Sequence, residues 1–148
     1  MTDRRRLSQV RDLALLRRAE RDAAGGDVAE ARTREQGAIA DAKAAADRVG
    51  ALAARWYDAN AGGALDPDTS AAIGRMLIHA EAGARVQADA AAKATRRHDA
   101  EIERWRGLDA HVRAADQVAR NLARRVARAD DEASLAATAD RVTAGWKR

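Results

Sequence analysis

The chain has 148 residues, a formal net charge of +4 and a sequence pI near 10.3. It contains no Phe, one Pro and 3% aromatic residues, whereas 34% of its residues are charged and most of its 47% hydrophobic share is Ala. Alanine favours helices but buries little apolar area, so this composition argues against a large globular core and favours a coiled coil. The absence of Cys excludes disulfides and thiolate metal sites.

The charges are mixed in sign along most of the chain, because Arg alternates with Asp and Glu. This pattern is typical of a solvated helix surface. No apolar run approaches the roughly 20 residues that span a bilayer. The basic start of the chain, residues 1–7, lacks the apolar core of a signal peptide and carries Asp3. We therefore expect a mature cytoplasmic protein.

The strongest break in the sequence lies between Asn60 and Ser70. Gly62 and Gly63 end a helix by permitting positive φ, and the dipeptide Asp66-Pro67 supplies an N-cap and a first-turn proline. The pattern predicts one domain over residues 1–148, with a helix at 4–60, a turn at 61–66 and a helix at 67–144. At 1.5 Å per residue the helices would be about 85 Å and about 115 Å long.

Each expected helix carries an apolar stripe with alternating steps of three and four residues, the rhythm of a left-handed coiled coil. The first stripe comprises Val28, Ala31, Glu35, Ala38, Ala42, Ala45, Val49, Leu52 and Trp56. The second comprises Trp105, Leu108, Val112, Ala115, Ala119, Leu122, Val126, Ala129 and Ala133. Ile102 stands one position out of register, so local irregularity is expected there. The predicted fold class is all-α, a long antiparallel two-helix coiled-coil hairpin.

A short turn makes the helices antiparallel, which predicts that Trp56 lies near Ile73 and Val28 near residues 97–99. The second helix would then run past the start of the first, leaving its end unpaired from about Arg124. The adjacent Gly25 and Gly26 predict a bend or frayed point in the first helix, because mid-helix glycines cost about 1 kcal/mol each relative to Ala.

The sequence contains no candidate for a catalytic site. His79, His98 and His111 are too far apart for a helical metal pair, and both glycine pairs lack the lysine and strand context of a phosphate-binding loop. We therefore expect no enzyme activity, no cofactor, no metal and no small-molecule substrate.

Two kinds of surface remain as candidates for binding. A row of arginines, Arg120, Arg124 and Arg128, follows one helical face, and it could contact phosphates or an acidic protein surface. Acidic residues follow at once and no aromatic residue interleaves, which favours a solvated or protein-binding face. Large apolar side chains also gather at residues 7–16 and around the turn, beside polar neighbours, as is typical of protein interfaces.

This layout resembles the family of the flagellar export protein FliJ and the YscO-like stalk proteins of injectisomes. The resemblance covers nearly the whole chain. It rests on the apolar segment Leu7–Leu16, the end of the first helix at residues 56–60, Trp105-Arg106 midway along the second helix, the basic Ala-rich stretch 122–137, and a length near 150 residues.

The resemblance implies a non-enzymatic stalk that sits in the hexameric export ATPase, contacts the cytoplasmic domain of the export gate and is linked to export chaperones. It would act in the cytoplasm, meeting the membrane only through the export apparatus. The candidates that it implies for binding the ATPase ring are Leu7, Val10, Leu13, Arg120, Arg124 and Arg128. Those for binding the export gate are Trp56, Tyr57, Met76, Leu77 and Ala80.

Three alternatives stay open on the sequence. Each apolar candidate could simply pack in the helix–helix seam. The chain could instead be a basic helical protein that binds nucleic acid, or a structural coiled-coil spacer. The resemblance also does not distinguish a flagellar protein from an injectisome protein.

Overall fold

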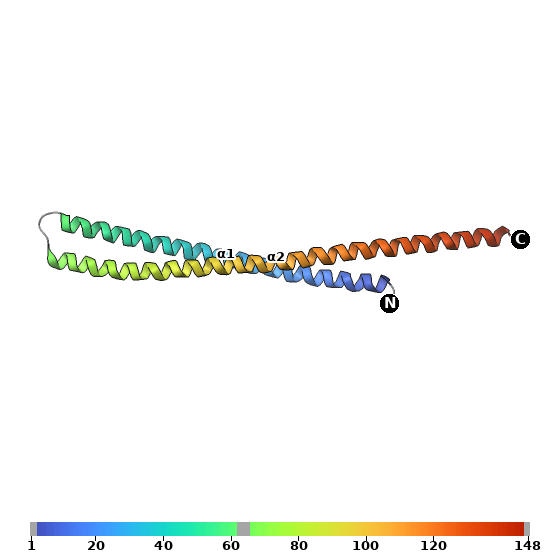
Figure 1. Ribbon diagram of the computed structural model, residues 1–148, viewed down its shortest axis with the longest axis horizontal. Helices are drawn as coiled ribbons and strands as arrows, with labels where there is room; N and C mark the ends of the chain where they lie inside the picture. The colour runs from blue at the N-terminus through green and yellow to red at the C-terminus, as the bar shows by residue number, and fades with distance from the viewer. Residues whose placement is uncertain (1–2, 62–65, 147–148) are drawn as a thin grey trace. The chain divides into compact units, whose positions relative to one another are not determined.

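The computed structural model describes residues 3–61 and 66–146, which form two α-helices (Figure 1). Helix α1 spans Asp3–Ala61 and helix α2 spans Pro67–Trp146. No strand occurs in these ranges. The predicted all-α antiparallel hairpin is confirmed, and the helices begin and end within two residues of the expected limits. Gly62 and Gly63, the predicted helix terminators, lie outside the described residues.

Helix α2 begins with a side-chain cap, as the Asp66-Pro67 dipeptide predicts. The Asp66 carboxylate accepts a hydrogen bond from the backbone N–H of Asp68 at 3.1 Å and another from the hydroxyl of Thr69. The bonds from Thr69 and from the Asp68 backbone hold the pKa of Asp66 below its usual value. Pro67 does not destabilise α2, because the N–H of the first helical residue has no acceptor within the helix and its absence therefore loses no hydrogen bond.

The chain divides into two compact units, and the division falls at the Gly25–Gly26 pair of α1 and between residues 103 and 104 of α2. The turn unit comprises the described part of residues 26–103. The termini unit comprises the described part of residues 1–25 and 104–148. Although the glycine pair marks this division, α1 is helical through both residues, so the pair neither breaks nor frays the helix, and the predicted bend stays a prediction.

In the turn unit, two contacts fix how the helices pair. The Trp56 indole nitrogen lies 3.8 Å from the position of a Cβ added to Gly74, close to the expected neighbour Ile73. The ring nitrogen Nδ1 of His98 lies 2.7 Å from a carboxylate oxygen of Glu35. His98 therefore pairs seven residues further along α1 than the predicted contact at Val28, and that prediction is wrong. Alanines recur along both stripes, so small side chains alone do not distinguish these registers.

The predicted stripe of α1 is the packed seam of this unit. Each of its nine residues from Val28 to Trp56 is buried or half-buried, with Ala31 4% and Leu52 8% exposed. Because most of these side chains are Ala, the seam is thin. Among the described residues, no large side chain is completely buried.

In the termini unit, ion pairs join the two antiparallel helices. Arg4 pairs with Asp130 at 2.5 Å, and Arg18 pairs with Asp116 at 2.6 Å. The pair at Arg4 shows that α1 covers α2 as far as Asp130, about six residues beyond the predicted start of the overhang.

The overhang of α2 comprises residues 131–146, where it runs past the N-terminal end of α1 (Figure 1). Every side chain described in the overhang is exposed, including Leu135 at 71% and Trp146 at 89%. The predicted stripe of α2 is buried or half-buried only up to Val126. The seam positions assigned to Ala129 and Ala133 are wrong, because both side chains are exposed: Ala129 lies beside the first described turn of α1, and Ala133 lies beyond it.

Candidate protein-interaction sites

The gate-side candidates lie in the turn unit, and they divide into exposed and packed residues. Tyr57 is 68% exposed and packs edge-on against the Trp56 ring, with centroids 5.6 Å apart and planes at 77°. Met76 is 55% exposed. Trp56, Leu77 and Ala80 are half-buried in the seam. Tyr57 and Met76 are therefore the members of this set that offer most of their surface to a partner.

Sequence reasoning left two exposed apolar residues of the same unit out of the gate-side set. Ile78 is 66% exposed and Val86 is 64% exposed. Both lie off the seam positions Leu77, Ala80 and Ala84 of α2. The signal that could have found them is the three-four rhythm of α2, which assigns neither residue to the seam.

The ring-side candidates lie in the termini unit and divide in the same way. Leu7 is 9% exposed and Val10 is half-buried, so both side chains serve the packing of α1 on α2. Leu13 is 45% exposed. Leu15 and Leu16, at 61% and 56%, extend the apolar surface of this segment beyond the chosen candidates.

The arginine row on α2 is exposed throughout. Arg120 donates a hydrogen bond to Gln117 at 2.9 Å, and Arg124 donates one to Asn121 at 2.7 Å. A surface hollow of about 540 Å³ follows this part of α2. Its lining residues are Val118, Asn121, Leu122, Arg124, Arg125 and Arg128. The hydrogen-bond partners of Arg120 and Arg124, Gln117 and Asn121, are neutral, so they do not compensate the guanidinium charges. The row is therefore a cationic surface.

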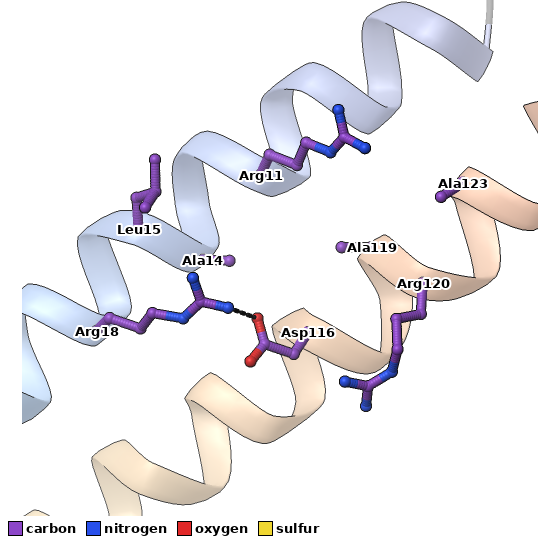
Figure 2. A pocket seen from close by; sticks show the side chains of 8 residues that line it. All are labelled: Arg11, Ala14, Leu15, Arg18, Asp116, Ala119, Arg120 and Ala123. Atoms are coloured by element: carbon purple, nitrogen blue, oxygen red, sulfur yellow. Dashed lines mark hydrogen bonds and ion pairs between the residues drawn. The ribbon is translucent and has the colours of Figure 1, made fainter.

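A groove of about 430 Å³ lies between α1 and α2 in the same unit. Figure 2 shows the Arg18–Asp116 ion pair at one end and Arg11 extending from α1 toward the turn of α2 that carries Ala119 and Ala123. The remaining lining residues are Ala14, Leu15 and Arg120. The groove thus combines a floor of small apolar side chains with the guanidinium groups of Arg11 and Arg18 and one carboxylate, while the Arg120 side chain extends away from Arg11 (Figure 2).

The seam of the turn unit contains a polar cluster that sequence reasoning saw only in parts. The side chains of Glu35 and His98 are 16% and 15% exposed, and they meet at 2.7 Å. A hydrogen bond from Thr95 and one from His98 hold the pKa of Glu35 below its usual value, with a smaller contribution from the charge of Arg32, while desolvation acts the other way. The sequence marks Glu35 as a polar position in the stripe, but its partner depends on the register.

We expect this cluster to make the hairpin sensitive to acid. A lowered carboxyl pKa contributes stability that is fully present above the ordinary Glu pKa of about 4.3 and is lost as the pH falls through the lowered value. The Tm of the wild type should therefore exceed that of Glu35→Gln at pH 6, and the difference should shrink as the pH falls below the ordinary Glu pKa. Circular dichroism melts across this range measure it.

Glu30→Gln is the matched control for that experiment. Glu30 is exposed and pairs with Arg34 on its own helix, so its removal breaks no contact between the helices. Its Tm should stay close to that of the wild type throughout. A Tm difference for Glu35→Gln that stays constant from pH 6 to pH 3 would contradict the assigned role of the carboxylate.

Two further properties of the described residues bear on function. Residues 3–61 and 66–146 contain no group of three or more His, Asp or Glu side chains placed to hold a metal ion. No helix within these ranges has both the length and the apolar character needed to cross a bilayer.

Comparison with known proteins adds no relative. No family model, curated protein or solved structure matches the chain.

Proposed function

We propose that this protein is a non-enzymatic stalk of a type III export ATPase complex. In this role the termini unit binds the ATPase ring and the turn unit binds the cytoplasmic domain of the export gate, with export chaperones as further partners. The protein acts in the cytoplasm, at the cytoplasmic face of the export apparatus. It carries no cofactor and reaches the membrane only through that apparatus.

The observation that carries the proposal is the uncovered end of an antiparallel helical hairpin. Residues 131–146 of α2 extend past α1 with all their described side chains exposed, and the arginine row lies just before them. A two-helix hairpin is narrow enough to enter a ring of subunits, which a globular domain of the same mass is not. The overhang gives such a ring an exposed helical surface to grip.

The division of exposed residues between the units also supports the proposal. The termini unit presents Leu13 and the arginines, whereas the turn unit presents Tyr57 and Met76. A cationic surface suits steering toward an acidic partner, and an exposed aromatic beside Met suits an apolar contact. Two chemically different surfaces fit a protein with two different partners.

The test is stimulation of a purified export ATPase from the same organism by the purified chain. We expect stimulation by the wild type, with about tenfold more protein needed for the half-maximal effect of the triple variant Arg120→Ala, Arg124→Ala, Arg128→Ala. Three exposed charge contacts at roughly 0.5 kcal/mol each account for that factor.

The matched control removes three exposed arginines from the turn unit, Arg34→Ala, Arg48→Ala and Arg55→Ala. It changes the net charge equally and should leave the half-maximal concentration within twofold of the wild type. No stimulation by the wild type would overturn the proposal. Steeply salt-dependent retention of the chain on DNA, without stimulation, would favour the nucleic-acid alternative.

A further inference from the structure

The groove beside Arg11 interrupts a regular series of ion pairs. Arg4, Arg11 and Arg18 follow one another at intervals of seven residues on the same flank of α1. The facing positions on α2, also seven apart, are Asp130, Ala123 and Asp116. The outer two levels are Arg–Asp pairs at 2.5 Å and 2.6 Å. At the middle level an alanine stands where the series would place a carboxylate.

The missing carboxylate leaves positive charge in the groove. Within the described residues, Arg11 takes part in no ion pair, and Arg120 at the groove's edge bonds only the neutral side chain of Gln117. Figure 2 shows the space beside Arg11, with Ala119 and Ala123 opposite it. The volume of about 430 Å³ accommodates a side chain from outside, because three of the lining residues are alanines.

We propose that a carboxylate from an acidic helical segment of a partner protein enters this groove and pairs with Arg11. The two flanking ion pairs show that this surface already binds single carboxylates through guanidinium groups. The apolar floor and the 61% exposed Leu15 suit the methylene groups and apolar neighbours of a peptide better than a bare phosphate. The partner segment therefore alternates Asp or Glu with Leu-like residues.

The inference goes beyond the proposed function, since it states the chemistry of a partner and needs no ATPase. The probe is a synthetic amphipathic helical peptide bearing Glu and Leu, and the control peptide has Gln in place of each Glu. Both are titrated into the full ¹⁵N-labelled chain while the arginine Nε–Hε signals are followed by NMR. The Arg11 signal should shift and saturate with the Glu peptide and stay in place with the Gln peptide.

Variants of the chain sharpen the result. Ala123→Asp supplies the missing carboxylate from within the chain, so it should weaken peptide binding at least tenfold while the Tm stays equal or rises. Arg11→Gln should weaken binding similarly without filling the groove. Arg125→Gln removes a cation that does not line this groove and should stay within twofold of the wild type.

Three outcomes would overturn the inference. Equal shifts with the Gln peptide would show that charge pairing plays no part. Unchanged binding by both Ala123→Asp and Arg11→Gln would place the peptide elsewhere on the chain. Tighter binding of inorganic phosphate or a DNA oligonucleotide than of the Glu peptide, at Arg11, would assign the groove to phosphates.

Discussion

Replacing Leu52 by Ala should destabilise the hairpin by about 2–3 kcal/mol. Leu52 is 8% exposed and is one of the few large side chains in a seam built mainly from alanines. A cavity left at this position cannot be filled by small neighbours, so the loss should exceed the transfer free energy of the deleted methyl groups alone. Urea unfolding followed by helical circular dichroism measures the change.

Leu135→Ala is the matched control, because it makes the same chemical change on a helix where the side chain is 71% exposed. Its free energy of unfolding should stay within about 0.5 kcal/mol of the wild type. Similar losses for the two variants would mean that Leu52 is not part of the packed seam, which would contradict the assigned helix–helix contact.

The double replacement Gly25→Ala, Gly26→Ala should raise the free energy of unfolding by about 2 kcal/mol. Both glycines are helical, and alanine is favoured over glycine inside a helix by about 1 kcal/mol per residue. A Cβ at Gly25 would lie 3.7 Å from the Trp105 ring nitrogen, an ordinary van der Waals contact, and one at Gly26 would meet nothing within 4 Å. Neither addition requires a neighbour to move.

Gly37→Ala, Gly50→Ala is the comparison for this pair, since an added Cβ meets nothing within 4 Å at either position. It should give a similar gain, because helix propensity is the common cause. Thermal and urea unfolding measure both. A loss of stability at Gly25 and Gly26, with a gain at Gly37 and Gly50, would show that the boundary between the two units depends on a backbone that alanine disfavours.

The secondary structure could be predicted because the sequence contains only one strong break, between Asn60 and Ser70, and a regular three-four rhythm on both sides of it. Those signals are local, and they fix helix limits and seam positions without knowledge of the partner helix. The end of the seam at Val126 could not be found this way. It depends on where α1 begins relative to α2, which is a property of the pairing.

Among the candidate surfaces, those that lie on one helix could be predicted from the sequence, and those that need both helices could not. The arginine row follows from spacing on one helix, and its exposure in the structure agrees with that reasoning. The groove beside Arg11 needs residues from both helices at one level, so it requires the register. Leu7 was a candidate for partner binding but packs in the seam. Hydrophobicity alone does not distinguish a packed residue from an exposed one.

The polar cluster of Glu35 and His98 has a consequence for how the chain finds a unique alignment. Sliding α2 by seven residues, to the alignment that sets His98 against Val28, would still offer Asp116 to Arg11 and Asp109 to Arg18. The alanines would meet other alanines. Glu35, however, would face Ala91, and both polar groups would lose their partner inside the seam, which is costly in a low-dielectric contact. The Glu35–His98 pair, together with the contact of Trp56 at Gly74, thus disfavours the neighbouring alignment, which the repeated small and charged residues do not exclude.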